Sequence, residues 1–461
     1  MKGSFKRLNS AIFNKMIFEE PDKIKNLRKK AYSTFEKLDI PSQVYGNGIK
    51  LELNMLDTDD INPLIAPISP SRKNSEQIYS YSSSACQAQY KSGSEEKCII
   101  CPLKEAIKKY PDKLIQYFAS VVPYDENKFI SLHYSAVKDG LFIYVPKNKN
   151  ITITIKSTVL SKSQFEHILV IADELSNVTI IEENGMEENK INKDENKETY
   201  RGNPKRSDYK NEDNSFNDKI NKNEINVNSD VNSEANYFRH QIVELIAKQS
   251  SKVNYITMQQ LPKNVVSFST KRSFQESDSS VVWTNVSLGS IFDKVDVQSL
   301  LAEQGAKSQH YGLYFGRKNQ MFDIYAANVH RKPHTISDIK IRIALDDDAK
   351  ALFRGLIRID PFASNSEGYQ KEDTLLLSEN AEANAIPNLE IENHDVRCSH
   401  GATISQLDKE QLFYITSRGL PKKIAKQQLT LAFMQPVIKE LPLEMISKIN
   451  QMISEKIFGK R

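Results

Sequence analysis

The chain has 461 residues, more than an ordinary single domain of roughly 100–200, although elongated repeat folds run longer as one body. Hydrophobic residues make up 39% of it and charged residues 26%, which indicates a normal core diluted by a polar segment. Its 63 basic and 59 acidic residues give no indication of nucleic-acid binding, and no apolar run approaches the roughly 20 residues of a membrane span.

Residues 1–120 are predicted to form an N-terminal region of helical or mixed structure. Between residues 22 and 38 apolar side chains recur at spacings of three and four, so they share one face of a helix. The Ser-rich stretch 69–89 is predicted to be a loop. A second helical stretch, 103–118, is expected to be broken in two at Pro111.

From about residue 128 the hydrophobic pattern changes to that of short strands, which continue to residue 403 with an interruption. The first β-branched segments are 141–145, 151–155, 167–171 and 178–181. The same rhythm resumes at Ile242, with Gly or Asn at the corners and no long amphipathic helix between the strands. This pattern favours a sandwich, a barrel or a β-solenoid, and the rhythm alone leaves these three open.

The interruption covers residues 184–236. It is dominated by Asn, Lys, Glu, Asp and Ser, and its apolar residues are scattered. Such a segment cannot bury enough surface to offset its conformational entropy, so we predict a disordered insertion in a loop of the β region 121–403.

Residues 404–461 are predicted to be helical again. Asp408 and Gly419 have the character of residues that begin and end a first helix. A second helix, 422–440, contains Pro436, which is expected to kink or shorten it. A third helix is amphipathic, and its apolar side consists of Met445, Ile449, Met452, Ile453 and Ile457.

The four cysteines are too few for a disulfide framework, and the N-terminus lacks the pattern of a secretory signal, so we expect a cytoplasmic protein. Cys98 and Cys101 form a C-x-x-C pair. The two isoleucines between them indicate a strand, in which a spacing of three places the thiols on opposite faces. We therefore interpret both as ordinary buried cysteines rather than as a zinc or redox site.

Two further motifs contain possible metal ligands. His330 and His334 have no Cys or carboxylate at a matching short spacing, so we interpret them as polar residues of a turn. Cys398 and His400 are two residues apart, which on a strand points both side chains to one face. A thiol and an imidazole there suit iron or zinc, and a buried Cys beside a hydrogen-bonded His explains the pair equally well.

The sequence contains no P-loop, no dinucleotide-binding glycine motif and no nucleophile elbow. We therefore expect that this chain binds no nucleotide and is not an enzyme.

A long ordered block of residues resembles the SufB/SufD family of iron–sulfur cluster assembly proteins. The strongest part is Asp395-Val-Arg-Cys-Ser-His-Gly-Ala-Thr403, and Ser417-Arg-Gly419 completes the pattern. Further similar segments are 353–360, 375–379 and 386–392, and weaker ones are 139–146, 312–314 and 333–335. The resemblance covers roughly residues 102–440 apart from the insertion.

The resemblance implies a right-handed parallel β-helix core flanked by helical N- and C-terminal regions. It implies a heterodimer with SufB through the β-helix, and docking of the ATPase SufC on the C-terminal helices, where Phe413, Leu431 and Phe433 are expected to be exposed. It also implies a transient iron–sulfur cluster shared with SufB. His400 is then the candidate metal ligand, and Cys398 a second candidate contact with the nascent cluster.

Particular residues favour the SufD type of this family. SufB-like chains carry Cys and His where this sequence has Ala381 and Asn384, and Glu on both sides of the His that matches His400, where it has Ser399 and Gly401. The family's acidic–Trp segment is missing around residues 42–51.

Three other functions stay open at this point. They are a SufB-type scaffold, a homodimeric adaptor that works without SufB, and a β-helix enzyme that processes carbohydrate or acyl groups. The enzyme is disfavoured because the predicted strands show neither a same-face pair of acidic residues nor a hexapeptide repeat.

Overall fold

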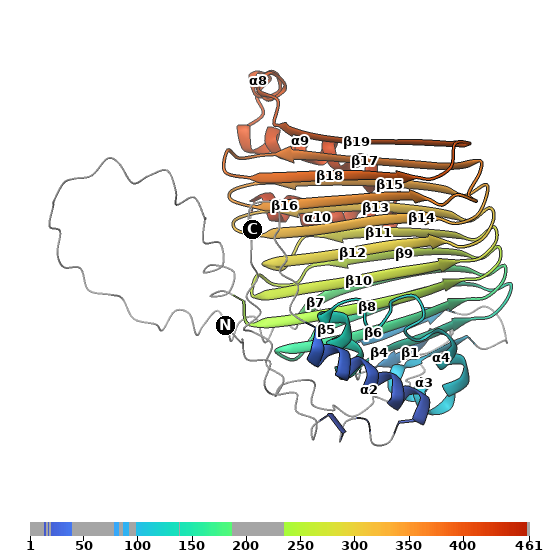
Figure 1. The fold of residues 1–461 in the computed structure, drawn as a ribbon. Helices are drawn as coiled ribbons and strands as arrows, with labels where there is room; N and C mark the ends of the chain where they lie inside the picture. Colours follow the sequence, from blue (N-terminus) through green and yellow to red (C-terminus); the bar gives the residue numbers. More distant parts are fainter. Residues whose placement is uncertain are drawn as a thin grey trace, which may run out of the picture.

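The computed structural model describes residues 13–14, 17, 20–38, 78–82, 86–91, 98–137, 139–186 and 235–458. At its centre is a parallel β-solenoid of about 8 turns, with helices from both ends of the chain packed around it (Figure 1). The chain is mainly β, with 48% strand and 24% helix. The expected β-helix core with flanking helices is confirmed, and the sandwich and the barrel are excluded.

Successive strands of the solenoid alternate between two sheets, and all neighbours from β4 onward pair in parallel. The 10-stranded sheet contains, in spatial order, β1 (Ile78–Ser82), β2 (Cys86–Lys91), β5 (Asn150–Val159), β7 (Asn177–Met186), β9 (Lys252–Gln259), β11 (Ser280–Ser287), β13 (Lys307–Gly316), β15 (Ile336–Leu345), β17 (Ser366–Leu376) and β19 (Val396–Gln406). The 9-stranded sheet contains β18 (Glu382–Ile391), β16 (Lys350–Ile359), β14 (Met321–His330), β12 (Phe292–Leu301), β10 (Val265–Gln275), β8 (Tyr237–Ala247), β6 (Ser163–Ala172), β4 (Asp139–Val145) and β3 (Ile99–Pro102).

The first four predicted strands are confirmed as parts of β4, β5, β6 and β7, which extend beyond the predicted segments. The predicted loop 69–89 is wrong where it is described, because it contains β1 and the start of β2. These two strands pair in antiparallel fashion with each other, and β2 pairs with β5. Serines between the tyrosines of β1 weaken the hydrophobic alternation by which a strand is recognised in a sequence. The remainder of 69–89 lies outside the described residues.

Seven successive corners, each between a strand of the 9-stranded sheet and the next strand of the 10-stranded sheet, use a residue with positive φ. These residues are Asn148, Leu175, Ser250, Asp278, Gly305, His334 and Asn365. Such a φ is costly for a residue other than glycine. The N–H of each donates to a carbonyl of the next corner, as Ser250 does to Ser277 at 2.9 Å and Asp278 to Gln304 at 3.0 Å. This ladder keeps the turns in register.

The interior of the solenoid is largely aliphatic but includes buried polar side chains, among them a network around Arg239. Arg239 on β8 pairs with Glu166 at 2.8 Å and donates to Asn184 at 3.1 Å. Asn184 is therefore part of the β-helix, and β7 runs on to Met186. The predicted bounds of the insertion, 184–236, are therefore wrong at both ends. Asn184 belongs to β7 at the first end, and Ala235 is buried at the second. Residues 187–234 lie outside the described residues.

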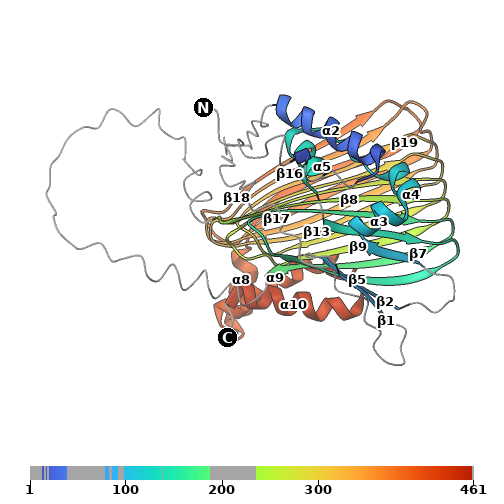
Figure 2. The same cartoon turned by 90° about the horizontal axis from the view of Figure 1, so that it is seen from below.

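Helices from the N-terminal part of the chain cover the outer face of the 9-stranded sheet (Figure 2). They are α2 (Asp22–Lys37), α3 (Leu103–Lys109), α4 (Pro111–Tyr117) and α5 (Lys128–Ala136). The helix at 22–38 and the break at Pro111 are confirmed. The start of the strand region at residue 128 is wrong, since α5 begins there. Asn127 caps α5 by accepting hydrogen bonds from the N–H groups of Phe129 and Ile130 at 3.0 and 3.1 Å.

A buried carboxylate joins the segment after α4 to the β-helix. Glu244 on β8 accepts hydrogen bonds from the backbone N–H groups of Ala119, Val121 and Val122 at 2.8, 2.9 and 3.0 Å. Its Oε2 also lies 3.1 Å from Nε2 of His167, and both side chains are fully buried. One side chain of the sheet thus fixes the path of the chain between α4 and α5.

The C-terminal helices are α8 (Lys409–Ser417), α9 (Lys422–Ile438) and α10 (Leu443–Phe458). Helices α9 and α10 pack on the outer face of the 10-stranded sheet (Figure 2), whereas α8 projects past the last turn (Figure 1). Asp408 caps α8, and Gly419, with φ +91°, follows its end, as predicted. Pro436 lies in the last turn of α9. The helix ends at Ile438, two residues before the predicted end at residue 440. No helix in the described ranges is long and apolar enough to span a membrane.

We expect Glu244→Gln to lower the free energy of unfolding by about 1–3 kcal/mol. Each Glu244 oxygen accepts from at least one backbone N–H, so the amide group of Gln must point a donor at a donor whichever way it is turned. Urea denaturation measures the change. Glu379→Gln is the control because Glu379 is exposed. Equal stability of the two variants would contradict the anchoring role of Glu244.

Candidate functional site

The last turn of the solenoid leaves two strand edges without a neighbour in the described chain. Strand β19 ends the 10-stranded sheet and β18 ends the 9-stranded sheet, at the top of Figure 1. Both strands are largely exposed, including the large apolar side chains of Ile386, Ile391 and Ile404. Because an open edge presents unpaired N–H and C=O groups, it readily pairs with another chain. This end is a candidate interface.

Cys398 and His400 lie on β19, opposite Gly368 and Gln370 of β17. Cys398 is half-buried against the aliphatic interior, and burial raises the pKa of its thiol. Alternate residues of a strand share a face, so His400 is on the same inward side as Cys398, as the spacing predicts. His400 is nevertheless exposed, because no further turn among the described residues covers it.

One turn below them, β17 carries three polar side chains on its inward face. Gln370, Glu372 and Thr374 are 3%, 0% and 1% exposed. The hydroxyl of Thr374 donates to Oε1 of Glu372. Within the described residues, neither Oε2 of Glu372 nor either amide atom of Gln370 has a hydrogen-bond partner. A buried polar group without a partner costs about 1–3 kcal/mol, so three such atoms together indicate a place for a ligand.

A glycine on the facing sheet makes room for Gln370. A Cβ on Gly355 of β16 would lie 2.3 Å from Nε2 of Gln370 and 2.5 Å from its Oε1. The amide of Gln370 therefore extends across the interior to the backbone of the opposite sheet. Gly355 belongs to the segment 353–360 of the family resemblance, and the structure gives it this steric role.

Burial raises the pKa of Glu372 to about 7. The hydrogen bond from Thr374 opposes this rise, the negative charge of Asp373 adds to it, and the positive charge of Arg342 also opposes it. Near neutral pH this side chain is therefore divided between the acid and the carboxylate.

The other candidate ligands do not converge on one another. Cys98 packs in the interior and Cys101 against the N-terminal helices, so the two thiols are buried on opposite faces, as predicted. His330 is buried and hydrogen-bonded to Thr335 at 2.8 Å, while His334 is a corner residue. No three His, Cys, Asp or Glu side chains in the described ranges are placed to bind a metal by themselves.

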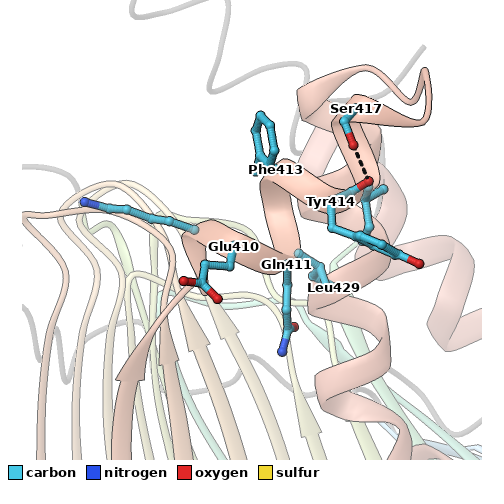
Figure 3. A pocket seen from close by; sticks show the side chains of 8 residues that line it. Glu410, Gln411, Phe413, Tyr414, Ser417 and Leu429 are labelled. Atoms are coloured by element: carbon cyan, nitrogen blue, oxygen red, sulfur yellow. Dashed lines mark hydrogen bonds between the residues drawn. The ribbon is translucent and has the colours of Figure 1, made fainter.

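A second exposed surface lies on α8, past the last turn. Phe413 and Tyr414 are 74% and 55% exposed, and with Leu429 of α9 they line an open hollow (Figure 3). Leu431 and Phe433, which were also expected to be exposed, are partly buried, because both pack against the apolar cluster between α9, α10 and the 10-stranded sheet.

Gln370 and Glu372 are functional candidates that reasoning from the sequence alone misses. The sign that would reveal them is a change from apolar to polar residues between neighbouring turns. On the inward face, Ile339, Ile341 and Ile343 of β15 are paired with Gln370, Glu372 and Thr374 of β17. Recognising that change requires the strand register, which the sequence does not provide.

Comparisons with known proteins relate both ends of the β-helix to one family. The family model described as SUF system FeS cluster assembly, SufBD core domain matches residues 220–433, and that of the SufBD protein N-terminal region matches residues 75–156. Iron–sulfur cluster assembly SufBD family proteins of Staphylococcus epidermidis and Staphylococcus haemolyticus are 26% identical over 96% of this chain and 90% of their own length. A protein of that description from Staphylococcus aureus is 26% identical over 95% and 90%.

We expect Glu372→Gln to stabilise the protein at pH 8 much more than at pH 5. Because the pKa of Glu372 is raised on folding, its stabilising contribution is complete below the unfolded pKa of about 4.5 and is lost as the pH rises toward 7. The gain from Gln should therefore grow by about 2 kcal/mol between the two pH values.

Urea denaturation at both pH values measures that difference. Glu367→Gln, on the outward face of the same strand, is the matched control. A gain that is the same at pH 5 and pH 8 would contradict the buried, proton-binding state of Glu372.

Proposed function

The chain belongs to the SufB/SufD family of iron–sulfur cluster assembly proteins, and we propose that it is the SufD-type subunit of a SufBCD complex. In this role it supports cluster assembly on a scaffold shared with SufB and has no catalytic turnover of its own. The observation that carries the proposal is the last turn, which presents His400 and Cys398 on a strand edge that has no neighbour in the described part of the chain.

The composition of the last turn supports the SufD type over the SufB type. Ala381 is buried in the interior cluster and Asn384 is exposed on β18, where SufB-like chains carry Cys and His. Ser399 and Gly401 flank His400 in place of two Glu residues. This turn therefore has fewer iron ligands than a SufB-like chain, which suits the partner of the principal scaffold.

The edges of β18 and β19 are the proposed contact with SufB. A β-helix that stacks on this end can continue both sheets and cover Ile386, Ile391 and Ile404. Stacking would also place ligands from SufB above the inward face of β19, where His400 stands. The partner then supplies the ligands that this chain lacks.

The proposed contact with the nascent cluster is the imidazole of His400, with Cys398 beside it. A neutral imidazole binds iron and releases it near physiological pH more readily than a full set of thiolates does. The raised pKa of Cys398 keeps its thiol protonated at neutral pH, which makes it the weaker of the two ligands. We propose no nucleotide site in this chain, so ATP is left to SufC.

Helix α8 is the proposed docking site for SufC. Its aromatic side chains Phe413 and Tyr414 are 74% and 55% exposed and line an open hollow beyond the last turn (Figure 3). A short helix that inserts such side chains into a groove of a partner is a common recognition mode. Because α9 and α10 pack on the 10-stranded sheet, we assign the contact with SufC to α8.

The cytoplasm is the proposed compartment. Cys98, Cys101 and Cys398 are free thiols in the structure. A ligand role for Cys398 requires that it stay reduced, as the cytoplasm ensures.

Replacing Phe413 and Tyr414 together by Ala is expected to reduce SufC binding at least tenfold while SufB binding is retained. The reason is that a single aromatic side chain buried in a groove of the partner commonly contributes about 2 kcal/mol or more of binding free energy. Co-purification and titration with SufC measure the effect. Leu443→Ala, which removes an 85% exposed apolar side chain at the start of α10, is the control. SufC binding that survives the double change would rule out α8 as the dock.

His400→Ala is expected to abolish most cluster formation on an intact SufBCD complex, and Cys398→Ala to reduce it less. His400 is the exposed ligand of the last turn, whereas Cys398 is half-buried and protonated. Iron and sulfide content per complex is measured, together with complementation in cells. His394→Ala, in the exposed loop before β19, is the control. Full cluster content in an intact His400→Ala complex would show that His400 is only structural.

A further inference from the structure

Glu372 differs from the other fully buried glutamates of the β-helix in what surrounds it. Glu166 and Glu182 share the guanidinium of Arg239, at 2.8 and 3.5 Å, and Glu244 accepts three backbone N–H groups. Glu372 receives one hydrogen bond, from the hydroxyl of Thr374. Its second oxygen has no partner among the described residues, although it lies in the turn next to the open end.

No positive charge of the described chain faces this oxygen from inside the solenoid. Arg342 pairs with Asp373 at 3.0 Å, and Lys371 lies 3.7 Å from the same carboxylate, on the outward side of the strands. The inward group therefore offers a carboxylate and the amide of Gln370 without a cation to balance them. A cation is the ligand that such a group favours, and an anion such as sulfide is disfavoured.

The imidazole of His400, on the neighbouring strand β19, helps to identify the kind of cation that Glu372 could bind. Neighbouring strands are about 4.8 Å apart, and alternate residues of a strand about 6.7 Å, so the Cα atoms of Glu372 and His400 lie roughly 8 Å apart. An ion with a bound water can span the space between a carboxylate and an imidazole at that separation. Oxygen and nitrogen donors together suit a first-row divalent metal, whereas Mg²⁺ and Ca²⁺ prefer oxygen alone.

We propose that Glu372 is the residue through which this chain receives ferrous iron for the cluster formed at His400. The inference rests on the proposed function and deepens it by naming the cargo that enters from this subunit. The Glu372 carboxylate is the direct ligand, and its proton, where present, leaves to solvent. The amide oxygen of Gln370 accepts a hydrogen bond from a water bound to the ion. The iron stays ferrous, and the remaining ligands are water and, in the complex, His400 and groups of the partner.

The test uses the isolated full-length chain and ferrous ammonium sulfate without oxygen, with equilibrium dialysis at pH 7.5. We expect one Fe²⁺ per chain, with affinity reduced at least tenfold in Glu372→Gln and unchanged in Glu367→Gln. Because Glu372→Gln is expected to be the more stable protein at this pH, the loss does not come from unfolding, which a thermal melt verifies. Co²⁺ serves as a spectroscopic probe, and its visible absorption should be lost in the same variant.

A second variant tests the site by steric displacement and leaves its charge unchanged. Gly355→Ala is expected to displace the amide of Gln370 and weaken Fe²⁺ binding while leaving Glu372 in place. Millimolar Mg²⁺ should not compete with Fe²⁺, whereas Zn²⁺ should.

The outcomes separate this inference from the proposed function. Equal Fe²⁺ binding by the parent and Glu372→Gln, or no binding by either, overturns the role of Glu372 and leaves that of His400 standing. Weaker association of Glu372→Gln with SufB, with unchanged Fe²⁺ binding, would show that a partner side chain occupies the position, and overturns the inference too. Normal clusters in the His400→Ala complex, with Fe²⁺ binding lost in Glu372→Gln, would refute the proposed function alone.

Discussion

In a parallel β-helix every inward side chain is stacked between the side chains at the same position one turn below and one turn above. One column of the 10-stranded sheet illustrates the constraint. Its members, in order, are Ile153, Ile180, Tyr255, Trp283, His310, Ile339, Gln370 and His400. Each member is covered by the next, so an aliphatic or aromatic residue is favoured throughout. The last member has nothing above it in the described chain, so His400 is exposed although it points inward.

The described helices cover the sides of the solenoid, and no described residue closes its end beyond β18 and β19. Helices α2 to α5 pack on the outer face of one sheet, and α9 and α10 on that of the other (Figure 2). These helices bury the outward apolar side chains, such as Phe268 and Phe315. No described helix lies across β18 and β19, and α8 extends past them (Figure 1). The two features assigned to partners, the strand edges and the aromatic side chains of α8, are thus neighbours at one end of the molecule.

Sequence patterns predicted most of the elements but not the buried polar residues next to the last turn. Strand alternation and proline positions depend on neighbours along the chain, so β4 to β7, the break at Pro111 and the three C-terminal helices could be predicted. The roles of Gln370 and Glu372 depend on what lies 31 residues earlier, at Ile339 and Ile341, and that distance is set by corner lengths. Likewise, the sequence does not reveal which apolar side chains of α9 face the sheet, and only the packing of α9 shows that Phe433 is partly buried there.

The position of Glu372 links stability to occupancy of the open end. An isoleucine there would continue the column of Ile341 and stabilise the isolated chain, whereas the buried carboxylate destabilises it near neutral pH. A ligand that binds this carboxylate in the folded state but not in the unfolded state raises the free energy of unfolding and so offsets that loss. The last turn is therefore the part of the β-helix whose stability gains most from a bound cation and a covering partner. A subunit built in this way holds its end turn most firmly when its cargo and its partner are both present.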